Sequence, residues 1–276
     1  MKIKTNKKER KSKKAKRFMA VFFTIAALCA AFLFTNQYFF KANNIIIGEN
    51  DRYSYDEILQ ASGISPGDEL YGINTSRVKT NIKEILTYTD SVKITRIPPS
   101  TLKIDITAEN GMFGIMLGGD YYIISENMRV VEKIKVVGSG GIYDFKPPEN
   151  IITFATHDIK KCYLGEKMEF SDNDIYDFMK EIAKFLKEEA DKNTRPDMPK
   201  IRSMDITDKF RVTMNYEDRF LVKFGLFENI SPKILNSYEV ISRLPDYAGG
   251  LIDLTDSKAA SFTFHEDILM LYGADT

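Results

Sequence analysis

The chain has 276 residues, with 39 basic and 39 acidic side chains, and therefore a formal net charge of zero at pH 7. Its two cysteines, Cys29 and Cys162, are too few for a zinc site of the usual cysteine-rich type, and we predict no metal or cofactor site. The length is sufficient to bury a core in two domains.

The N-terminus combines a basic block with an uncharged stretch. Residues 1–17 carry ten Lys or Arg and one Glu, a net charge of +9, which leaves −9 for the rest. A block of this density cannot bury apolar surface, so we expect it to be disordered. Residues 18–40, FMAVFFTIAALCAAFLFTNQYFF, contain no charge and are long enough for a transmembrane helix, which needs about 20 residues. A cleaved signal peptide would have a shorter apolar region, of about 7–15 residues.

The charge asymmetry orients this predicted anchor. By the positive-inside rule, the basic tail stays in the cytoplasm and residues 41–276 lie outside the cell membrane. The tail is then a topology signal that also contacts anionic membrane lipid. We therefore expect a single-pass membrane protein, and no nucleic-acid partner.

Residues 41–110 read as strand, helix, helix, strand, strand. In the first predicted helix, residues 54–62, Ser54 and Glu57 have the spacing of a capping box. The second predicted helix, residues 75–88, carries apolar side chains at helical spacing. These are Val78, Ile82, Ile85 and Leu86.

The hairpin VKITRIPPSTLKIDITAEN, residues 92–110, closes this domain. Leu102, Ile104 and Ile106 alternate with polar residues after the double proline, which indicates a strand with one buried face. We expect this face to pack on the two helices, against Ile82 and Ile85 among others.

Residues 111–276 are mostly strand. The alternating segments predict strands within 120–134, 201–225 and 249–264, and helices at 171–190 and 231–244. Ser231 is the expected N-cap of the last helix, with Pro232 at its first position. No long internal repeat is expected.

The order of these elements resembles the FtsQ/DivIB family of bacterial cell-division proteins, and the first exported domain resembles a POTRA (polypeptide-transport-associated) module. The matching residues of the first domain are Ile45 to Gly48, Tyr55 to Leu59, Gly67, Leu70, Ile73, Arg96, Pro99, Leu102, Ile104, Ile106 and Glu109. The second domain carries YYIISENMRVV, VKFG, GGLIDL and SFTF in the family's order. The resemblance implies an α+β fold: a single transmembrane helix, a POTRA domain at 41–110, and a mostly antiparallel β domain at 111–276 with two or more helices.

The resemblance also implies a function without catalysis. The family is a membrane-anchored scaffold of the divisome at the division septum. Its partners are FtsB/DivIC-like and FtsL-like single-pass coiled-coil proteins and, through them, the septal peptidoglycan synthase complex. The coiled-coil partner adds a strand to the final edge of the second domain. The matching positions are Ile252, Asp253, Leu254, Ala260, Ser261, Phe262, Thr263 and Phe264. An ordinary core strand is the alternative interpretation of these residues.

Two fragments suggest an enzyme instead. SRVK, Ser76 to Lys79, matches the SxxK nucleophile motif of penicillin-binding transpeptidases, and SDN, Ser171 to Asn173, matches their second motif. The third motif is missing, because KFG at Lys223 lacks the hydroxyl residue. Both fragments fall at predicted helix starts, where Ser and Asp serve as caps. A POTRA-bearing export component is a further alternative, but the long lipid-facing strands of a barrel are not apparent. We predict that the protein is not an enzyme.

Overall fold

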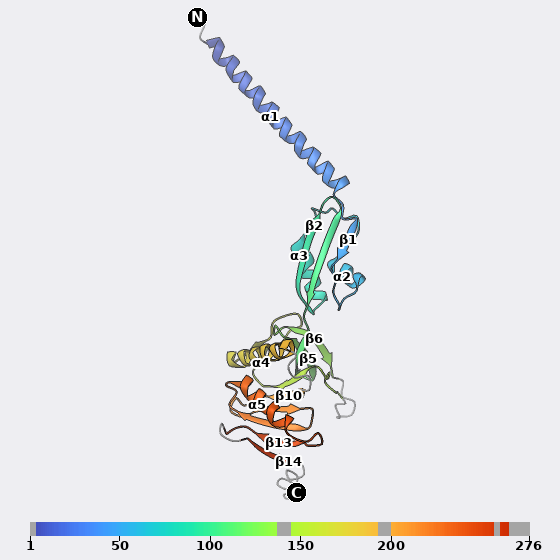
Figure 1. The fold of residues 1–276 in the computed structure, drawn as a ribbon. Coiled ribbons are helices and arrows are strands. Elements are labelled where there is room, and N and C mark those ends of the chain that lie inside the picture. Colours follow the sequence, from blue (N-terminus) through green and yellow to red (C-terminus); the bar gives the residue numbers. More distant parts are fainter. Residues whose placement is uncertain (1–3, 137–144, 193–199, 257–259, 265–276) are drawn as a thin grey trace. The chain divides into compact units, whose positions relative to one another are not determined.

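The computed structural model describes residues 4–136, 145–192, 200–256 and 260–264. It forms two compact units, residues 1–108 and 109–276 (Figure 1).

Helix α1, Lys4–Phe39, includes most of the basic block. The expected disorder of that block is therefore wrong from Lys4 onward. Lys, Arg, Glu and Ala are good helix formers, and a helix propagates easily once it is nucleated. No helix in the described part of the chain combines the length and the apolar character needed to cross a bilayer. The membrane anchor stays a prediction from the sequence.

The rest of the first unit has the predicted order of elements. These are β1 (Asn44–Ile47), α2 (Tyr55–Ser62), α3 (Thr75–Ile85), β2 (Thr89–Ile97) and β3 (Thr101–Ala108). Strand β3 lies at the centre of a three-stranded sheet, parallel to β1 and antiparallel to β2. The two helices and the sheet share one apolar core.

Local sequence explains most of this unit. The capping box is present, because the Ser54 side chain accepts from the Glu57 N–H and the Glu57 carboxylate accepts from the Ser54 N–H. Leu102 and Ile104 are fully buried, as predicted. The placement of Ile85 in the core is wrong, since its side chain is 63% exposed. Ile85 is the last residue of α3, and Leu86 is buried in its place.

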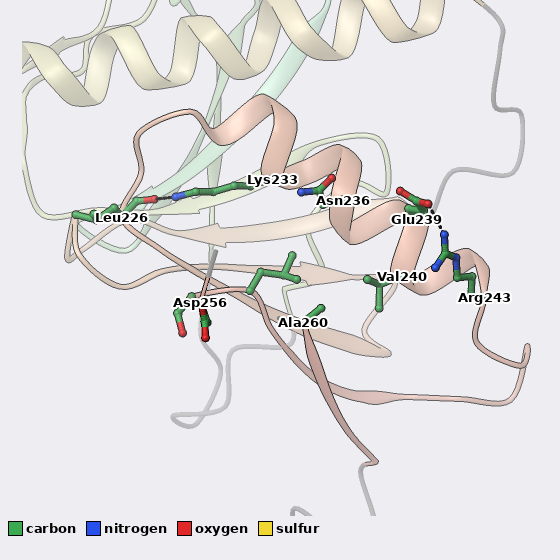
Figure 2. A pocket seen from close by; sticks show the side chains of 10 residues that line it. Leu226, Lys233, Asn236, Glu239, Val240, Arg243, Asp256 and Ala260 are labelled. Carbon is green, nitrogen blue, oxygen red and sulfur yellow. Dashed lines mark hydrogen bonds and ion pairs between the residues drawn. The ribbon is translucent and has the colours of Figure 1, made fainter. Parts of the chain in front are cut away.

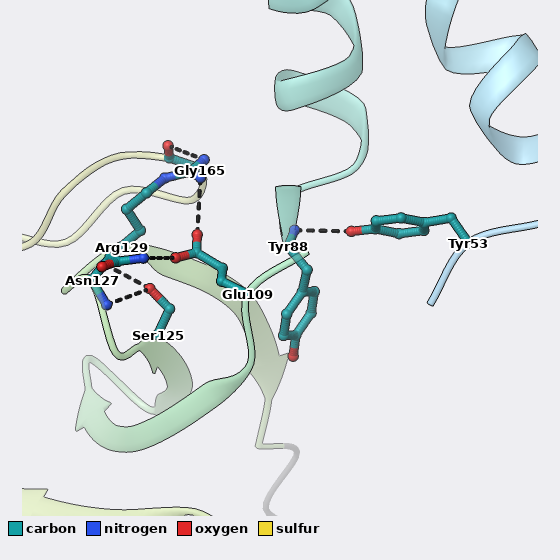
Figure 3. Close-up of polar contacts among 7 residues, drawn as sticks. All are labelled: Tyr53, Tyr88, Glu109, Ser125, Asn127, Arg129 and Gly165. Atoms are coloured by element: carbon teal, nitrogen blue, oxygen red, sulfur yellow. Dashed lines mark hydrogen bonds and ion pairs between the residues drawn. The ribbon is translucent and has the colours of Figure 1, made fainter. Parts of the chain in front are cut away.

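Arg96 has a structural role in the first unit. Its guanidinium donates to the carbonyl oxygens of Leu70 (2.8 Å) and Ile73 (2.6 Å), in the segment between α2 and α3. These carbonyls have no helix or strand partner, so the bonds fix that segment against β2. Elsewhere in this unit, the Tyr53 hydroxyl accepts a 3.0 Å hydrogen bond from the Tyr88 N–H (Figure 3).

The second unit is built on a nine-stranded sheet. Its strands, in spatial order, are β14 (Ser261–Phe264), β13 (Gly250–Asp253), β12 (Phe220–Gly225), β11 (Val212–Tyr216), β10 (Ile201–Asp205), β7 (Ile152–Ala155), β4 (Gly111–Leu117), β5 (Asp120–Ser125) and β6 (Val130–Lys135). Five of its eight pairings are antiparallel and three are parallel. The small strands β8 (Ile159–Lys161) and β9 (Glu169–Phe170) form a separate pair.

Helices α4 (Asn173–Lys192) and α5 (Ile230–Ser242) contribute to a single core with this sheet. The predicted N-cap of α5 is wrong: the cap is Asn229, in a left-handed conformation at φ 53°. Ser231 instead donates its hydroxyl to the Glu181 carboxylate on α4, at 2.8 Å. A partner from another helix has thus replaced the local cap.

The second unit begins with a buried ion pair. The Glu109 carboxylate, 1% exposed, accepts from the Arg129 guanidinium at 2.9 Å and from the Asn127 amide at 3.1 Å (Figure 3). Arg129 also donates to the Gly165 carbonyl oxygen at 3.2 Å. This group joins the start of the unit to the β5–β6 turn and to the loop between β8 and β9.

Candidate functional site: the β14 edge

Strand β14 is the last strand of the sheet among those that the structure describes. It pairs antiparallel with β13, with Leu251 opposite Thr263 and Ile252 opposite Phe262. Strand β13 is in turn paired with β12 in parallel, and this pairing anchors β13 in the sheet.

The structure brings the predicted partner-binding residues together on these two strands or directly beside them, as for Leu254 and Ala260, but with different exposure. Ile252 is completely buried and belongs to the core. Phe262 is half-buried and packs on Phe220, with ring centroids 6.3 Å apart. Phe264 is 44% exposed, and its ring meets that of Phe262 at 4.7 Å. The others are exposed (Ala260, Ser261) or half-buried (Asp253, Leu254, Thr263).

The hydrogen bonds of β13 determine which backbone groups of β14 point away from the sheet. The N–H groups of Gly250 and Leu254 donate to β12, to the carbonyl oxygens of Arg219 (2.9 Å) and Lys223 (2.8 Å). Because strand backbone groups alternate in direction, Leu251 and Asp253 must face β14. Their antiparallel partners then point their N–H and C=O groups back toward β13.

It follows that Phe262 and Phe264 direct their N–H and C=O groups outward. Thr263 and Ser261, the partners of Leu251 and Asp253, are the inward-bonded residues. Sequence alternation could show which side chains share a face. It could not show this direction, because the direction depends on the bonds that β13 makes with β12.

A pocket of about 560 Å³ lies beside this edge, between α5 and the chain that follows β13 (Figure 2). Its apolar lining comes from Leu226, Val240, Leu254 and Ala260, and its charged lining from Lys233, Glu239, Arg243 and Asp256. This pocket was not predicted from the sequence, because its walls come from segments far apart in the chain.

The charged groups of the pocket differ in their partners. Arg243 is paired with Glu239, one turn away on α5. The Lys233 ammonium donates to the carbonyl oxygens of Leu226 and Phe224. Burial lowers the pKa of Lys233 from its ordinary value, because desolvation disfavours the charged form.

The transpeptidase fragments have structural explanations. Ser76 and Lys79 are exposed on α3, whose N-cap is Asn74: its side chain accepts from the Ser76 and Arg77 N–H groups, both at 3.1 Å. Ser171 belongs to the other compact unit and precedes α4. Over the described ranges, no three His, Cys, Asp or Glu side chains come together as metal ligands would.

Comparisons with known proteins agree with this architecture. Residues 40–107 match the family model of the FtsQ-type POTRA domain. Cell division protein FtsQ of Corynebacterium glutamicum is 30% identical over 100 residues, which is 36% of this chain and 45% of that protein. Cell division protein DivIB of Clostridium botulinum (strain Hall) is 21% identical over 235 residues, 85% of each chain.

The fold and these matches first define a class, the POTRA-containing proteins with a second, strand-rich domain. Within that class, the predicted resemblance to the FtsQ/DivIB family of cell-division proteins is confirmed. The matched segment of the Corynebacterium relative is less than half of that protein's length.

Proposed function

We propose that this protein is a non-enzymatic, membrane-anchored scaffold of the bacterial division machinery. In this proposal it lies in the cell membrane at the septum, with its N-terminus in the cytoplasm. It links FtsB/DivIC-like and FtsL-like coiled-coil proteins to septal peptidoglycan synthesis. The names of the relatives support a role in cell division, and the charge pattern of residues 1–40 supports a membrane anchor.

One observation carries the binding part of the proposal. The outward N–H and C=O groups of Phe262 and Phe264 form a regular ladder along β14, the last strand that the structure describes, beside an exposed aromatic side chain. A partner strand that aligns with β14 gains main-chain hydrogen bonds from these groups and apolar contact with the Phe264 ring. Strand addition obtains its affinity from the main chain and its specificity from side-chain pockets.

The pocket beside β14 suits the residues that flank such a strand. Leu226, Val240 and Leu254 offer apolar surface, and Lys233 offers a cation that donates to backbone carbonyl oxygens. A partner segment with an apolar side chain and an acidic side chain would complement both. This interpretation extends the predicted site from β13 and β14 to one face of α5.

The test compares two changes at one outward-facing position. Phe264→Pro removes the outward N–H together with the ring, and Phe264→Ala removes only the ring. We expect Phe264→Pro to weaken binding of the FtsB/DivIC-like partner at least about tenfold beyond Phe264→Ala, the loss of roughly one hydrogen bond. Affinity would be measured with the full-length chain in detergent. Equal affinities of the two variants would contradict strand addition at this edge.

A further inference from the structure

The packed part of the first unit begins directly after α1. Helix α1 ends at Phe39, and Ala42 is already completely buried in the core of the unit. Phe40 also belongs to the packed part, because its carbonyl oxygen accepts a 2.8 Å hydrogen bond from the Leu70 N–H. Only Phe40 and Lys41 therefore separate the helix from the buried core.

Exposed apolar side chains gather where the chain enters this unit. The Tyr71 ring packs on the half-buried Phe40 ring, with centroids 5.3 Å apart, and Tyr71 is 47% exposed. The β2–β3 turn adds Ile97, which is 44% exposed, and the exposed residues Pro98 and Pro99. We call these five residues the entry surface.

Hydrogen bonds hold the parts of the entry surface at one end of the unit. The Arg96 guanidinium, near the end of β2, donates to carbonyl oxygens on either side of Tyr71. The Asn44 N–H donates to the Ser100 carbonyl oxygen at 3.1 Å, which joins the β2–β3 turn to the start of β1. The chain entry, the loop between α2 and α3, and the β2–β3 turn therefore lie together.

The charged side chains of these segments balance one another. Lys41 lies opposite Glu69 in an antiparallel bridge, and the Asp68 carbonyl oxygen accepts from the backbone of the chain entry. With Arg96, the segments carry two basic and two acidic residues. The entry surface therefore has no excess charge with which to select an anionic partner, and its apolar side chains determine what it contacts.

The dimensions of a bilayer decide what lies against the entry surface. Under the proposed membrane anchor, on which this inference rests, residues 18–39 of α1 are about 33 Å long and cross about 30 Å of hydrocarbon. The headgroup layer on each side is about 5–7 Å thick, and two extended residues reach at most about 7 Å. The entry end of the unit must therefore lie within the headgroup layer.

We propose that the entry surface is a membrane-binding surface, in which Phe40, Tyr71 and Ile97 contact the lipid interface of the outer leaflet. A tyrosine suits this depth, because its ring contacts acyl chains while its hydroxyl remains among the headgroups. A unit held by one helix alone could tilt about Phe40 and Lys41. Contact of Tyr71 and Ile97 with lipid restricts this motion and fixes the unit against the membrane.

Single tryptophan reporters test this contact. The chain contains no tryptophan, so each variant carries one reporter. Ile97→Trp and Tyr71→Trp place it on the entry surface. Ile85→Trp is the matched control, because Ile85 is 63% exposed and precedes the opposite end of β2, whose nine residues are about 26 Å long. Phe39→Trp reports on the anchor itself.

The full-length variants would be reconstituted in phosphatidylcholine vesicles that contain no other protein, with and without a nitroxide quencher on the lipid headgroup. We expect quenching of Ile97→Trp and Tyr71→Trp to exceed that of Ile85→Trp at least about threefold, because interfacial side chains lie about 5–10 Å deep in the headgroup and acyl boundary. A quenched Phe39→Trp, with equal quenching of Ile97→Trp and Ile85→Trp, overturns the membrane-binding surface and leaves the anchor intact. An unquenched Phe39→Trp contradicts the anchor and this inference with it.

Discussion

The two ends of the nine-stranded sheet are built differently. At the β6 end, the Val130 N–H donates to the Glu166 carbonyl oxygen (2.9 Å) and the Val130 carbonyl accepts from the Gly165 N–H (2.7 Å). Strand β6 also carries Glu132, Lys133 and Lys135. Loops and charged side chains are the usual means by which natural sheets prevent edge-to-edge association.

In its described part, the β14 end has neither a covering loop nor charged side chains on its edge strand. Residues 260–264, ASFTF, carry no charge, and the aromatic rings of Phe262 and Phe264 lie side by side. One edge of the sheet is therefore protected by its own loops, and the other retains an apolar strand that is suitable for pairing. An edge of the second kind is suited to accept a strand from a partner.

The largest effect on stability is expected from a substitution at the β6 end of the sheet. Arg129→Ala would leave the Glu109 carboxylate buried without its cation. We expect this change to lower the free energy of unfolding by about 3–5 kcal/mol. Urea denaturation would measure the change. Lys133→Ala, which removes a more exposed pair with Asp120, is the control and should cost at most about 1 kcal/mol. Equal losses would show that the Glu109 group does not stabilise this end.

The second prediction separates inward from outward backbone groups on β14. Thr263→Pro removes an N–H that bonds to β13 and should destabilise the second unit by about 1–3 kcal/mol relative to Thr263→Ala. Phe264→Pro, compared with Phe264→Ala, should cost less, because its N–H points away from β13. Thermal unfolding of the four variants decides the matter. A larger proline effect at Phe264 than at Thr263 would reverse the derived direction of the strand.

Local sequence determined much of the first unit. The Ser54–Glu57 capping box and the alternation of Leu102, Ile104 and Ile106 depend on neighbours in the chain, and the structure contains both. Ile85 was placed wrongly because helical spacing defines a face but does not show where the helix ends against its neighbours. The N-cap of α5 was missed because Ser231 is bonded to Glu181, 50 residues away.

The candidate site was only partly predictable for the same reason. The residues of β13 and β14 could be named from the sequence, but Ile252 is core and only its neighbours are accessible. The direction of the β14 backbone follows from two hydrogen bonds between β13 and β12. The parallel pairs β4–β7 and β7–β10, which set the order of the sheet, connect segments that no local pattern associates.

The smallest expected effect concerns the turn that leads into β14. The hydroxyl and N–H of Thr255 both donate to Asp253, and these bonds lower the pKa of its carboxyl. Because the folded-state pKa is below the unfolded value of about 3.9, this stabilisation is complete above pH 5 and is lost as the pH falls through the folded pKa.

The substitution Asp253→Asn keeps the acceptor oxygen but has no proton to bind. The variant should therefore lose less thermal stability than the wild type between pH 5 and pH 2.5, by an amount below about 1 kcal/mol for a half-exposed turn. Parallel pH dependences of the two melting temperatures would show that the Asp253 turn does not hold β14 in place through its charge.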